Sequence, residues 1–268
     1  MSQLSIFDAM SDAAGIESPP APAAVTPRMV TGDVARRQFV SEFRHTAPYL
    51  RRWDVFSDFI TLAASELDIT RIRTPENIER SRKICDRYQP ADLQKLKKLF
   101  CLLVAALEGG FQDFLGSVFM ELELGSGDMG QFFTPYSLSR LMASVLTGDI
   151  EQQLKRCPWV TLDEPTSGAG GMVIAFAEAM LNAGYNPSTQ LLVTTTDIDP
   201  VAADMTFIQL SLLGIPAIVH TGNTLNLTVS RTRCTPVYWI ENWPNRIRSH
   251  ERIQAMREFI KASSRNHV

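Results

Sequence analysis

Short apolar runs alternate with helical stretches in the second half of the sequence, and this alternation limits the folds that the chain can adopt. The predicted strands span residues 159–162, 191–195 and 217–220, and the helices between them span 173–181 and 202–213. A β-α-β-α-β order predicts a parallel sheet, because each crossover helix returns the chain to the edge where the previous strand began. The expected class is therefore α/β, with a doubly wound, Rossmann-like sheet.

The residues ahead of this region are predicted to form a tail and an all-helical N-terminal module. Residues 1–32 form the tail, and most of it, 9–32, is rich in Ala, Pro, Gly and Ser, which is typical of a disordered tether. Apolar residues recur at three- and four-residue spacing through 33–124, which predicts a helical domain. The sheet domain is assigned to 125–268, with a charged terminal helix at 246–262.

Composition excludes several classes of protein. The net charge of −3 provides no general positive field for DNA, so any contact with nucleic acid must be local or assisted by a partner. The four cysteines and four histidines show no ligand spacing, so neither a metal site nor a disulfide scaffold is predicted. No long apolar run and no signal peptide occur, so a cytoplasmic protein without a membrane span is expected.

A glycine-rich segment lies between the first predicted strand and the helix after it. It contains Gly168, Gly170 and Gly171, preceded by the polar residues Glu164 and Thr166. Glycine permits positive φ and close approach of a ligand, and the helix that follows offers unpaired N–H groups. Such loops hold nucleotides or the methionine end of S-adenosylmethionine; the alternative is a tight turn without a ligand.

Polar residues also follow the second and third predicted strands. Asp197 is placed to accept hydrogen bonds from both ribose hydroxyls of an adenosine, whereas Asp199 is expected to cap the next helix. Asn223 is a candidate adenine ligand or an ordinary turn residue. The spacing of the glycines differs from the dinucleotide pattern G-x-G-x-x-G, which favours a methyl donor over NAD.

Four segments occur in the order found in one family of enzymes: GQFFTP at 130–135, EPTSGAGG at 164–171, TTDID at 195–199 and GNTL at 222–225. Together they resemble the modification (methylase) subunits of type I restriction-modification systems and related adenine-N6 DNA methyltransferases. The resemblance covers about residues 110–226 and implies S-adenosylmethionine as cofactor, DNA as substrate, and a specificity or other subunit as partner.

The resemblance also assigns roles to individual residues. It implies that Phe132, Phe133, Thr134 and Pro135 wrap the methionine end of the cofactor, where an aromatic pair would face the sulfonium cation. The alternative is two core phenylalanines ahead of a helix that starts at proline. In the family's pattern, an aspartate stands at the positions of Glu164 and Asn223.

The acceptor motif of the family, Asn/Asp-Pro-Pro-Tyr/Phe, is absent. Its nearest counterpart contains Thr235, Pro236 and Tyr238, which are the candidate catalytic residues for orienting the flipped adenine. The alternative is a core strand with aromatic packing. Few residues follow this segment, so the sheet is expected to be partial. Either methyl transfer uses a variant motif, or the chain is a catalytically inactive module that acts through DNA, the sliding clamp or a restriction-modification partner.

The N-terminal residues QLSIF resemble the short peptide by which bacterial proteins dock on the DNA sliding clamp. Leu4, Ile6 and Phe7 would fill an apolar pocket and Gln3 would bond at its rim. The tether behind the peptide gives it reach. The alternative is that these apolar residues cover the helical domain.

Overall fold

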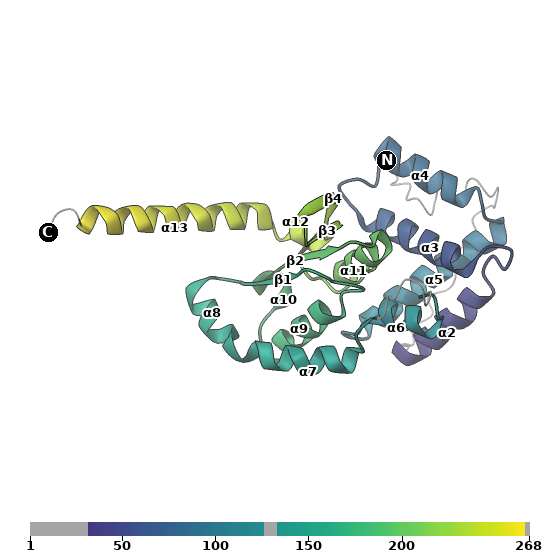
Figure 1. The fold of residues 1–268 in the computed structure, drawn as a ribbon, viewed down its shortest axis with the longest axis horizontal. Helices are drawn as coiled ribbons and strands as arrows, with labels where there is room; N and C mark the ends of the chain where they lie inside the picture. The colour runs from purple at the N-terminus through teal and green to yellow at the C-terminus, as the bar shows by residue number, and fades with distance from the viewer. Residues whose placement is uncertain (1–31, 126–132, 266–268) are drawn as a thin grey trace, which may run out of the picture.

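The computed structural model describes residues 32–125 and 133–265, with side chains up to residue 260. Figure 1 shows a bundle of helices on one side, a small sheet in the middle, and one long helix that projects from the other side. Within the described ranges no helix is long and apolar enough to cross a membrane.

The helical part confirms the all-helical module predicted from apolar spacing. Helices α4 and α5 both begin at proline, which fits the first turn because its N–H would be unpaired there. Helix α6 is capped by Asp113, whose carboxylate accepts from the N–H of Gly116 at 2.9 Å. The helices that the structure describes between residues 32 and 125 are α2 (Gly32–Arg44), α3 (Arg52–Leu67), α4 (Pro75–Cys85), α5 (Pro90–Glu108) and α6 (Phe114–Glu121).

In the described part of the chain, the sheet has four strands in the order β1-β2-β3-β4. Strands β1 (Val160–Glu164), β2 (Leu191–Asp197) and β3 (Ala217–Asn223) are parallel, as predicted. The sequence did not predict the fourth strand, β4 (Thr228–Cys234), which pairs antiparallel with β3. The register shifts between Thr221 and Gly222, and glycine is required there because a Cβ on Gly222 would lie 2.2 Å from the carbonyl oxygen of Thr228.

The helices of this part connect the strands and extend beyond them. They are α7 (Tyr136–Leu146), η1 (Thr147–Asp149), α8 (Ile150–Arg156), α9 (Gly171–Asn182), α10 (Pro187–Gln190), α11 (Pro200–Leu212), α12 (Pro236–Ile240) and α13 (Trp243–Arg265). The strand order runs in one direction, so right-handed crossovers place α9 and α11 on the same face of the sheet. Within the described chain, β1 and β4 are the edge strands of the sheet.

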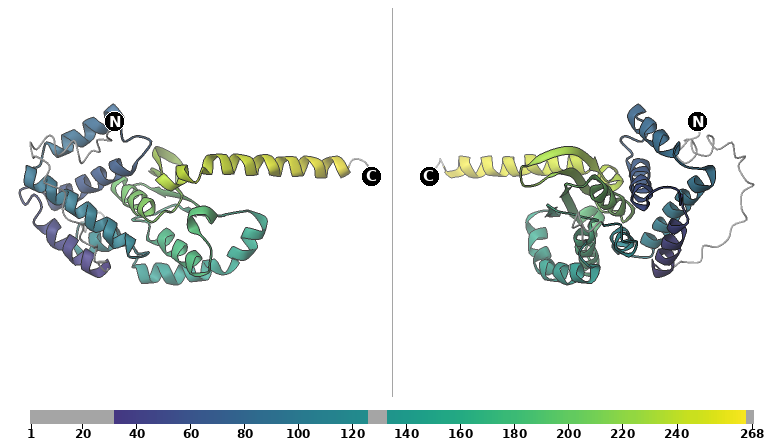
Figure 2. Two further views of the ribbon diagram at one scale, coloured as in Figure 1. Left: turned by 180° about the vertical axis from the view of Figure 1, so that it is seen from behind. Right: turned by 45° about the vertical axis from the view of Figure 1, so that its right-hand side comes forward.

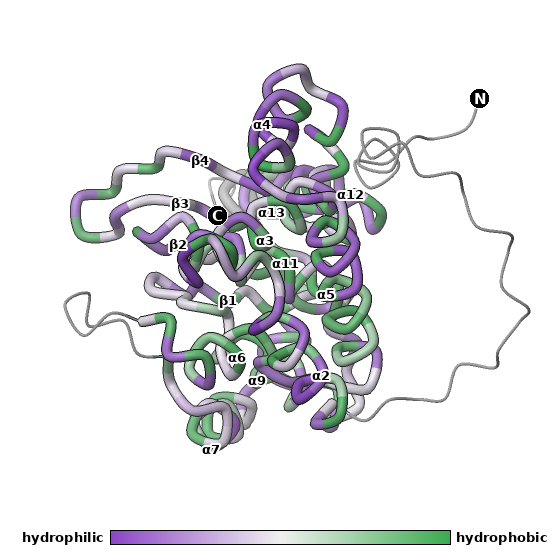
Figure 3. Tube along the Cα trace, turned by 90° about the vertical axis from the view of Figure 1, so that its right-hand side faces the viewer, coloured by the Kyte–Doolittle hydropathy of each residue, from purple (hydrophilic) through white to green (hydrophobic). Residues whose placement is uncertain are grey.

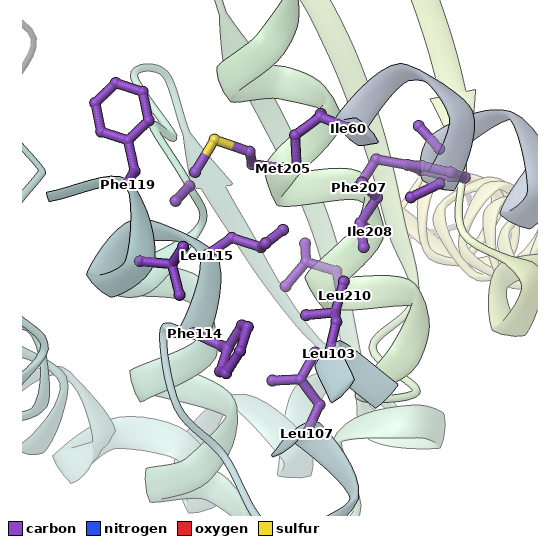
Figure 4. Packing of buried hydrophobic residues seen from close by; sticks show 14 of the residues in the cluster. Ile60, Leu103, Leu107, Phe114, Leu115, Phe119, Met205, Phe207, Ile208 and Leu210 are labelled. Atoms are coloured by element: carbon purple, nitrogen blue, oxygen red, sulfur yellow. The ribbon is translucent and has the colours of Figure 1, made fainter. Parts of the chain in front are cut away.

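Helix α11 joins the sheet to the helical part. All nine residues from 202 to 210 are buried, so this helix has no solvent-facing stripe over most of its length. Figure 4 shows its side chains Met205, Ile208 and Leu210 packed among those of α3, α5 and α6. One hydrophobic core therefore runs through both parts of the chain, since it contains residues from Ala35 in α2 to Val219 in β3.

A smaller aromatic cluster covers part of the other face of the sheet. Trp159, Tyr238 and Trp243 form it, and the guanidinium of Arg246 lies 3.9 Å from the ring centroid of Trp243. From this cluster α13 extends away from the body of the molecule (Figures 1 and 2). The terminal helix predicted at 246–262 is thereby confirmed, with an earlier start.

Candidate functional site

The carboxyl ends of the three parallel strands bring the predicted cofactor residues to one edge of the sheet. β1 leads into the glycine loop, β2 ends at Asp197 and β3 ends at Asn223. The backbone N–H of Gly168 donates to Asp197 Oδ2 at 2.7 Å, and the hydroxyl of Thr224 donates to the carbonyl oxygen of Pro165 at 2.6 Å. The loop is therefore fastened to the end of β2 and to the turn that follows β3.

The glycines of this loop meet conformational and steric requirements. Gly168 has φ of +55° and Gly170 has φ of +92°, the left-handed region that favours glycine. A Cβ on Gly171 would lie 3.1 Å from a carboxylate oxygen of Asp113. Gly170 immediately precedes α9, a helix of 12 residues, whose first N–H groups face the loop.

Phe133 lies directly against this loop. A Cβ on Gly168 would come within 2.9 Å of the Phe133 ring, which also packs edge-on against Phe119 at a centroid distance of 4.9 Å. Thr134 and Pro135 follow as exposed residues before α7. Phe132 lies outside the described residues. Phe133 thus packs on the core, as the alternative interpretation expected, and it also borders the glycine loop; its contact with the cofactor stays a prediction.

The Asp197 carboxylate is held in place by backbone donors. Its Oδ1 accepts from the N–H of Asp199 at 2.9 Å, and its Oδ2 accepts from Gly168. Burial raises the pKa of Asp197, although these N–H groups lower it. Each oxygen retains a second lone pair for a further donor. Asp199 caps α11 as predicted, accepting from the N–H of Val201 at 2.8 Å.

Glu164 and Asn223 take part in local turns at the same edge. Glu164 Oε1 accepts from the N–H of Thr166 at 3.2 Å. Asn223 Oδ1 accepts from the N–H of Leu225 at 2.9 Å, so the turn predicted as one alternative for Asn223 is present. An adenine contact from the Asn223 amide nitrogen stays a prediction.

A buried polar network, not predicted from the sequence, lies behind the loop. Gln209 on α11 donates to the carbonyl oxygen of Ala169 at 2.7 Å and to Asp113 Oδ1 at 2.9 Å, and it accepts from the N–H of Leu115 at 2.9 Å. Thr206, one turn earlier, donates to the carbonyl oxygen of Gly168 at 2.9 Å. The available signal was a set of polar residues, Thr206 and Gln209 among them, within a mostly apolar helix; buried polar side chains require hydrogen-bond partners.

The structure does not bring the candidate acceptor segment to this edge. Because β4 runs antiparallel to β3, its end returns to the start of β3, at the opposite edge of the sheet. There Thr235 donates to the carbonyl oxygen of Ile215 at 2.8 Å and accepts from the N–H of Ala217 at 2.9 Å. The strand alternative for this segment is wrong, since Pro236 begins α12; its aromatic packing is confirmed, since Tyr238 lies in the aromatic cluster.

Three parallel strands with a glycine loop and an acidic residue at their carboxyl ends define a Rossmann-like protein. The chain belongs to the N-6 DNA methylase family, whose sequence pattern matches residues 118–256. The residues proposed to dock on the clamp, Gln3, Leu4, Ile6 and Phe7, lie outside the described part of the chain.

Two solved structures resemble the chain at low identity. One is a putative class I S-adenosylmethionine-dependent methyltransferase from Listeria monocytogenes, with 12% identity and a TM-score of 0.33 over 68% of this chain and 51% of that one. The other is the methyltransferase subunit of a type I restriction-modification system from Streptococcus thermophilus, with 13% identity and a TM-score of 0.37 over 72% of this chain and 58% of that one. The chain thus spans between half and three-fifths of their lengths. No curated protein matches the sequence.

Proposed function

We propose that the chain binds S-adenosylmethionine at the carboxyl ends of β1–β3 and forms the cofactor-binding part of an adenine-N6 DNA methyltransferase. The observation that carries the proposal is the bond between Asp197 and Gly168, which places an acidic acceptor beside a left-handed glycine loop at a helix N-terminus. Family membership supports the choice of a methyl donor over a dinucleotide.

The residues of this edge fit the parts of the cofactor. Asp197 would accept from the ribose hydroxyls through its remaining lone pairs, and Asn223 would donate from its amide nitrogen to the adenine. The loop N–H groups ahead of α9 would hold the carboxylate of the methionine end. Phe133 would shield the sulfonium group, with Thr134 and Pro135 completing that wall. The bound cofactor would supply an electrophilic methyl group.

Cofactor titration by isothermal calorimetry tests this proposal. Asp197→Ala is expected to abolish binding of S-adenosylmethionine, and Asp197→Asn to weaken it. Asp149→Asn serves as the matched control, because Asp149 is an exposed carboxylate at the far end of the α7–α8 connection. Equal affinity in all three variants and the parent chain would contradict the proposed site.

A second candidate function is that of a methyltransferase-like module without catalysis. It is favoured by the position of Thr235, Pro236 and Tyr238, which lie at the opposite edge from the glycine loop. The N6-methyladenine content of DNA from cells lacking other adenine methyltransferases decides between the two. A rise on expression that vanishes in Asp197→Ala supports methyl transfer, whereas cofactor binding without a rise supports the inactive module.

The N-terminal peptide is proposed to recruit the protein to the sliding clamp. Leu4, Ile6 and Phe7 would be the apolar anchors and Gln3 the polar one. Phe7→Ala is expected to remove binding of the full chain to purified clamp in surface plasmon resonance, while Phe259→Ala, which alters an exposed phenylalanine on α13, leaves it unchanged. Clamp binding by the Phe7→Ala protein at parental affinity would exclude this role.

A further inference from the structure

A cavity lies between α4 and β4, where the helical part meets the outer strand of the sheet. Its volume is about 670 Å³, within the usual range for ligand sites. Figure 3 shows the two elements next to each other, both mostly hydrophilic. The lining contains none of the residues of the glycine loop, but it holds four arginines: Arg71, Arg80, Arg231 and Arg233.

Two of these arginines are anchored by buried carboxylates. Asp204 on α11 accepts from Arg231 at 2.6 Å and also from Arg233. Arg233 Nε lies 3.3 Å from Asp68 Oδ2, so this buried guanidinium sits between two acidic groups. Such pairing is what keeps a buried charge tolerable. Arg233 therefore serves the fold, and it ties β4 to α3 and α11.

The other two arginines are poorly neutralised. Arg71 is 3.9 Å from Asp68, a carboxylate that already faces Arg233. Arg80 forms no ion pair with any acid in the described parts of the chain, and its charge acts on Arg231. Burial lowers the pKa of Arg231, Asp204 raises it, and the positive charges of Arg233 and Arg80 lower it. Several positively charged guanidinium groups thus line one cavity, and their mutual repulsion costs electrostatic free energy.

The cavity also contains an unused donor at the start of α4. The side chain of Asn77 is buried, at 7% exposure, and its amide nitrogen has no acceptor among the described residues. Asn77 lies in the first turn of α4, where the helix dipole favours negative charge. The acids that line the cavity are Asp68, which faces Arg233, and Glu76, which is exposed.

We propose that this cavity binds the phosphate backbone of a DNA strand, with Arg80, Arg71 and Arg231 as the phosphate contacts. A guanidinium matches phosphate geometry, and an added anion would relieve the repulsion between Arg80 and Arg231. DNA is the phosphate source that fits a member of an N-6 DNA methylase family. Because the net charge is −3, DNA contact requires a local patch or the help of a partner, and this cavity provides such a patch.

The position of the cavity fits a role in presenting DNA to the proposed cofactor edge. Arg231 pairs with Thr221 on β3, close to the carboxyl end of that strand. A strand bound here would therefore pass near Asn223. The inference rests on the proposed function for its choice of DNA, but it does not require that S-adenosylmethionine bind.

Fluorescence anisotropy of a labelled DNA duplex, titrated with the full chain from 50 to 200 mM KCl, tests the proposal. Arg80→Gln is expected to weaken binding about three- to eightfold at 0.1 M salt and to lower the slope of log K against log salt by about 0.9, the value for one lost phosphate contact. The matched control is Arg82→Gln, an exposed arginine on the same helix that does not line the cavity. It is expected to leave the slope unchanged.

Three results would overturn the proposal: no binding of DNA by the parent chain at 50 mM KCl, equal effects of Arg80→Gln and Arg82→Gln, or displacement by poly-glutamate or a mononucleotide at lower concentration than by unlabelled duplex. Calorimetry with S-adenosylmethionine on the same proteins separates this site from the cofactor site. Arg80→Gln should retain cofactor affinity, and Asp197→Ala should retain the DNA slope, so failure of one site is distinguishable from failure of the other.

Discussion

The amide nitrogen of Gln209 on α11 donates to the carboxylate of Asp113 ahead of α6 at 2.9 Å, joining two residues that are far apart in the sequence. The same side chain also bonds to the glycine loop through Ala169. Both side chains are almost fully buried, and burial raises the pKa of Asp113. The glycine loop is thus held by the helical part as well as by the sheet.

Gln209→Leu is expected to destabilise the protein by about 3 kcal/mol, because it removes the side-chain partner of the Leu115 N–H and of the Ala169 carbonyl oxygen, and one of the two donors to Asp113 Oδ1 among the described residues. Urea unfolding measures the change. Ser211→Ala on the same helix is the control, since the buried Ser211 hydroxyl has no partner in the described structure. Its expected effect is within about 0.5 kcal/mol. Similar losses in both variants would contradict the role of Gln209.

Gly168→Ala is expected to destabilise the protein and to weaken binding of S-adenosylmethionine. The added Cβ faces both the strain of φ +55° and overlap with the Phe133 ring. Gly184→Ala is the control, because Gly184 has φ of +87° but open space around it, so the strain of about 1 kcal/mol acts alone. Thermal unfolding and calorimetry measure the two effects.

The overlap between an added Cβ at Gly168 and the Phe133 ring predicts that substitutions at these two positions affect each other. Truncation of the ring in Phe133→Leu should reduce the additional loss caused by Gly168→Ala, so the two substitutions should not be additive. Additive losses would show that Phe133 does not border the loop in solution.

The affinity for S-adenosylmethionine is expected to fall at acidic pH. Burial raises the pKa of Asp197, so this carboxylate gains its proton at a higher pH than an ordinary aspartate, whose pKa is about 3.9. The ionised form is the better acceptor for ribose hydroxyls, so affinity declines as pH falls through the raised pKa, and binding there releases a proton. Calorimetry in buffers of different ionisation enthalpy detects that proton. Asp197→Asn should remove the pH dependence, and its persistence in this variant would assign it to another group.

Thr235→Val is expected to lower stability by about 1–3 kcal/mol without changing cofactor affinity, because the hydroxyl bonds only to the backbone of Ile215 and Ala217 among the described residues. Thr235→Ser keeps the hydroxyl and should retain most of the stability. Urea unfolding and calorimetry provide the two measurements. A loss of cofactor affinity at unchanged stability would place Thr235 in the functional site instead.

Much of the fold could be predicted from local sequence. The parts that could not be predicted depend on contacts between distant segments or on strands with a weak apolar pattern. The three parallel strands and the cap at Asp199 carry strong local signals, namely apolar runs and a short acceptor ahead of a helix. Strand β4 carries a weak one, because much of it is exposed and its sequence, TVSRTRC, is mostly polar. The antiparallel direction of β4 places Thr235 at the edge of the sheet opposite the glycine loop. Because this strand was not predicted, the position of Thr235 could not be predicted either.

The candidate site shows the same division. The positions of Asp197 and of the glycines could be predicted because they depend on strand ends and backbone conformation. The partners Gln209 and Asp113 could not be paired, since their contact depends on how α11 packs against α6. The arginine-lined cavity could not be predicted either, because it forms only where α4 and β4 come together, and no local sequence pattern predicts that contact.

The single core that runs from α2 to β3 has a consequence for how the molecule can be divided. A fragment that ends before the sheet would expose the apolar faces of α3, α5 and α6 that normally enclose α11, and it would be prone to aggregate. Melting of the sheet should carry the helices with it in one calorimetric transition. Recombination between related genes would therefore have to transfer the helical part and the sheet as one unit.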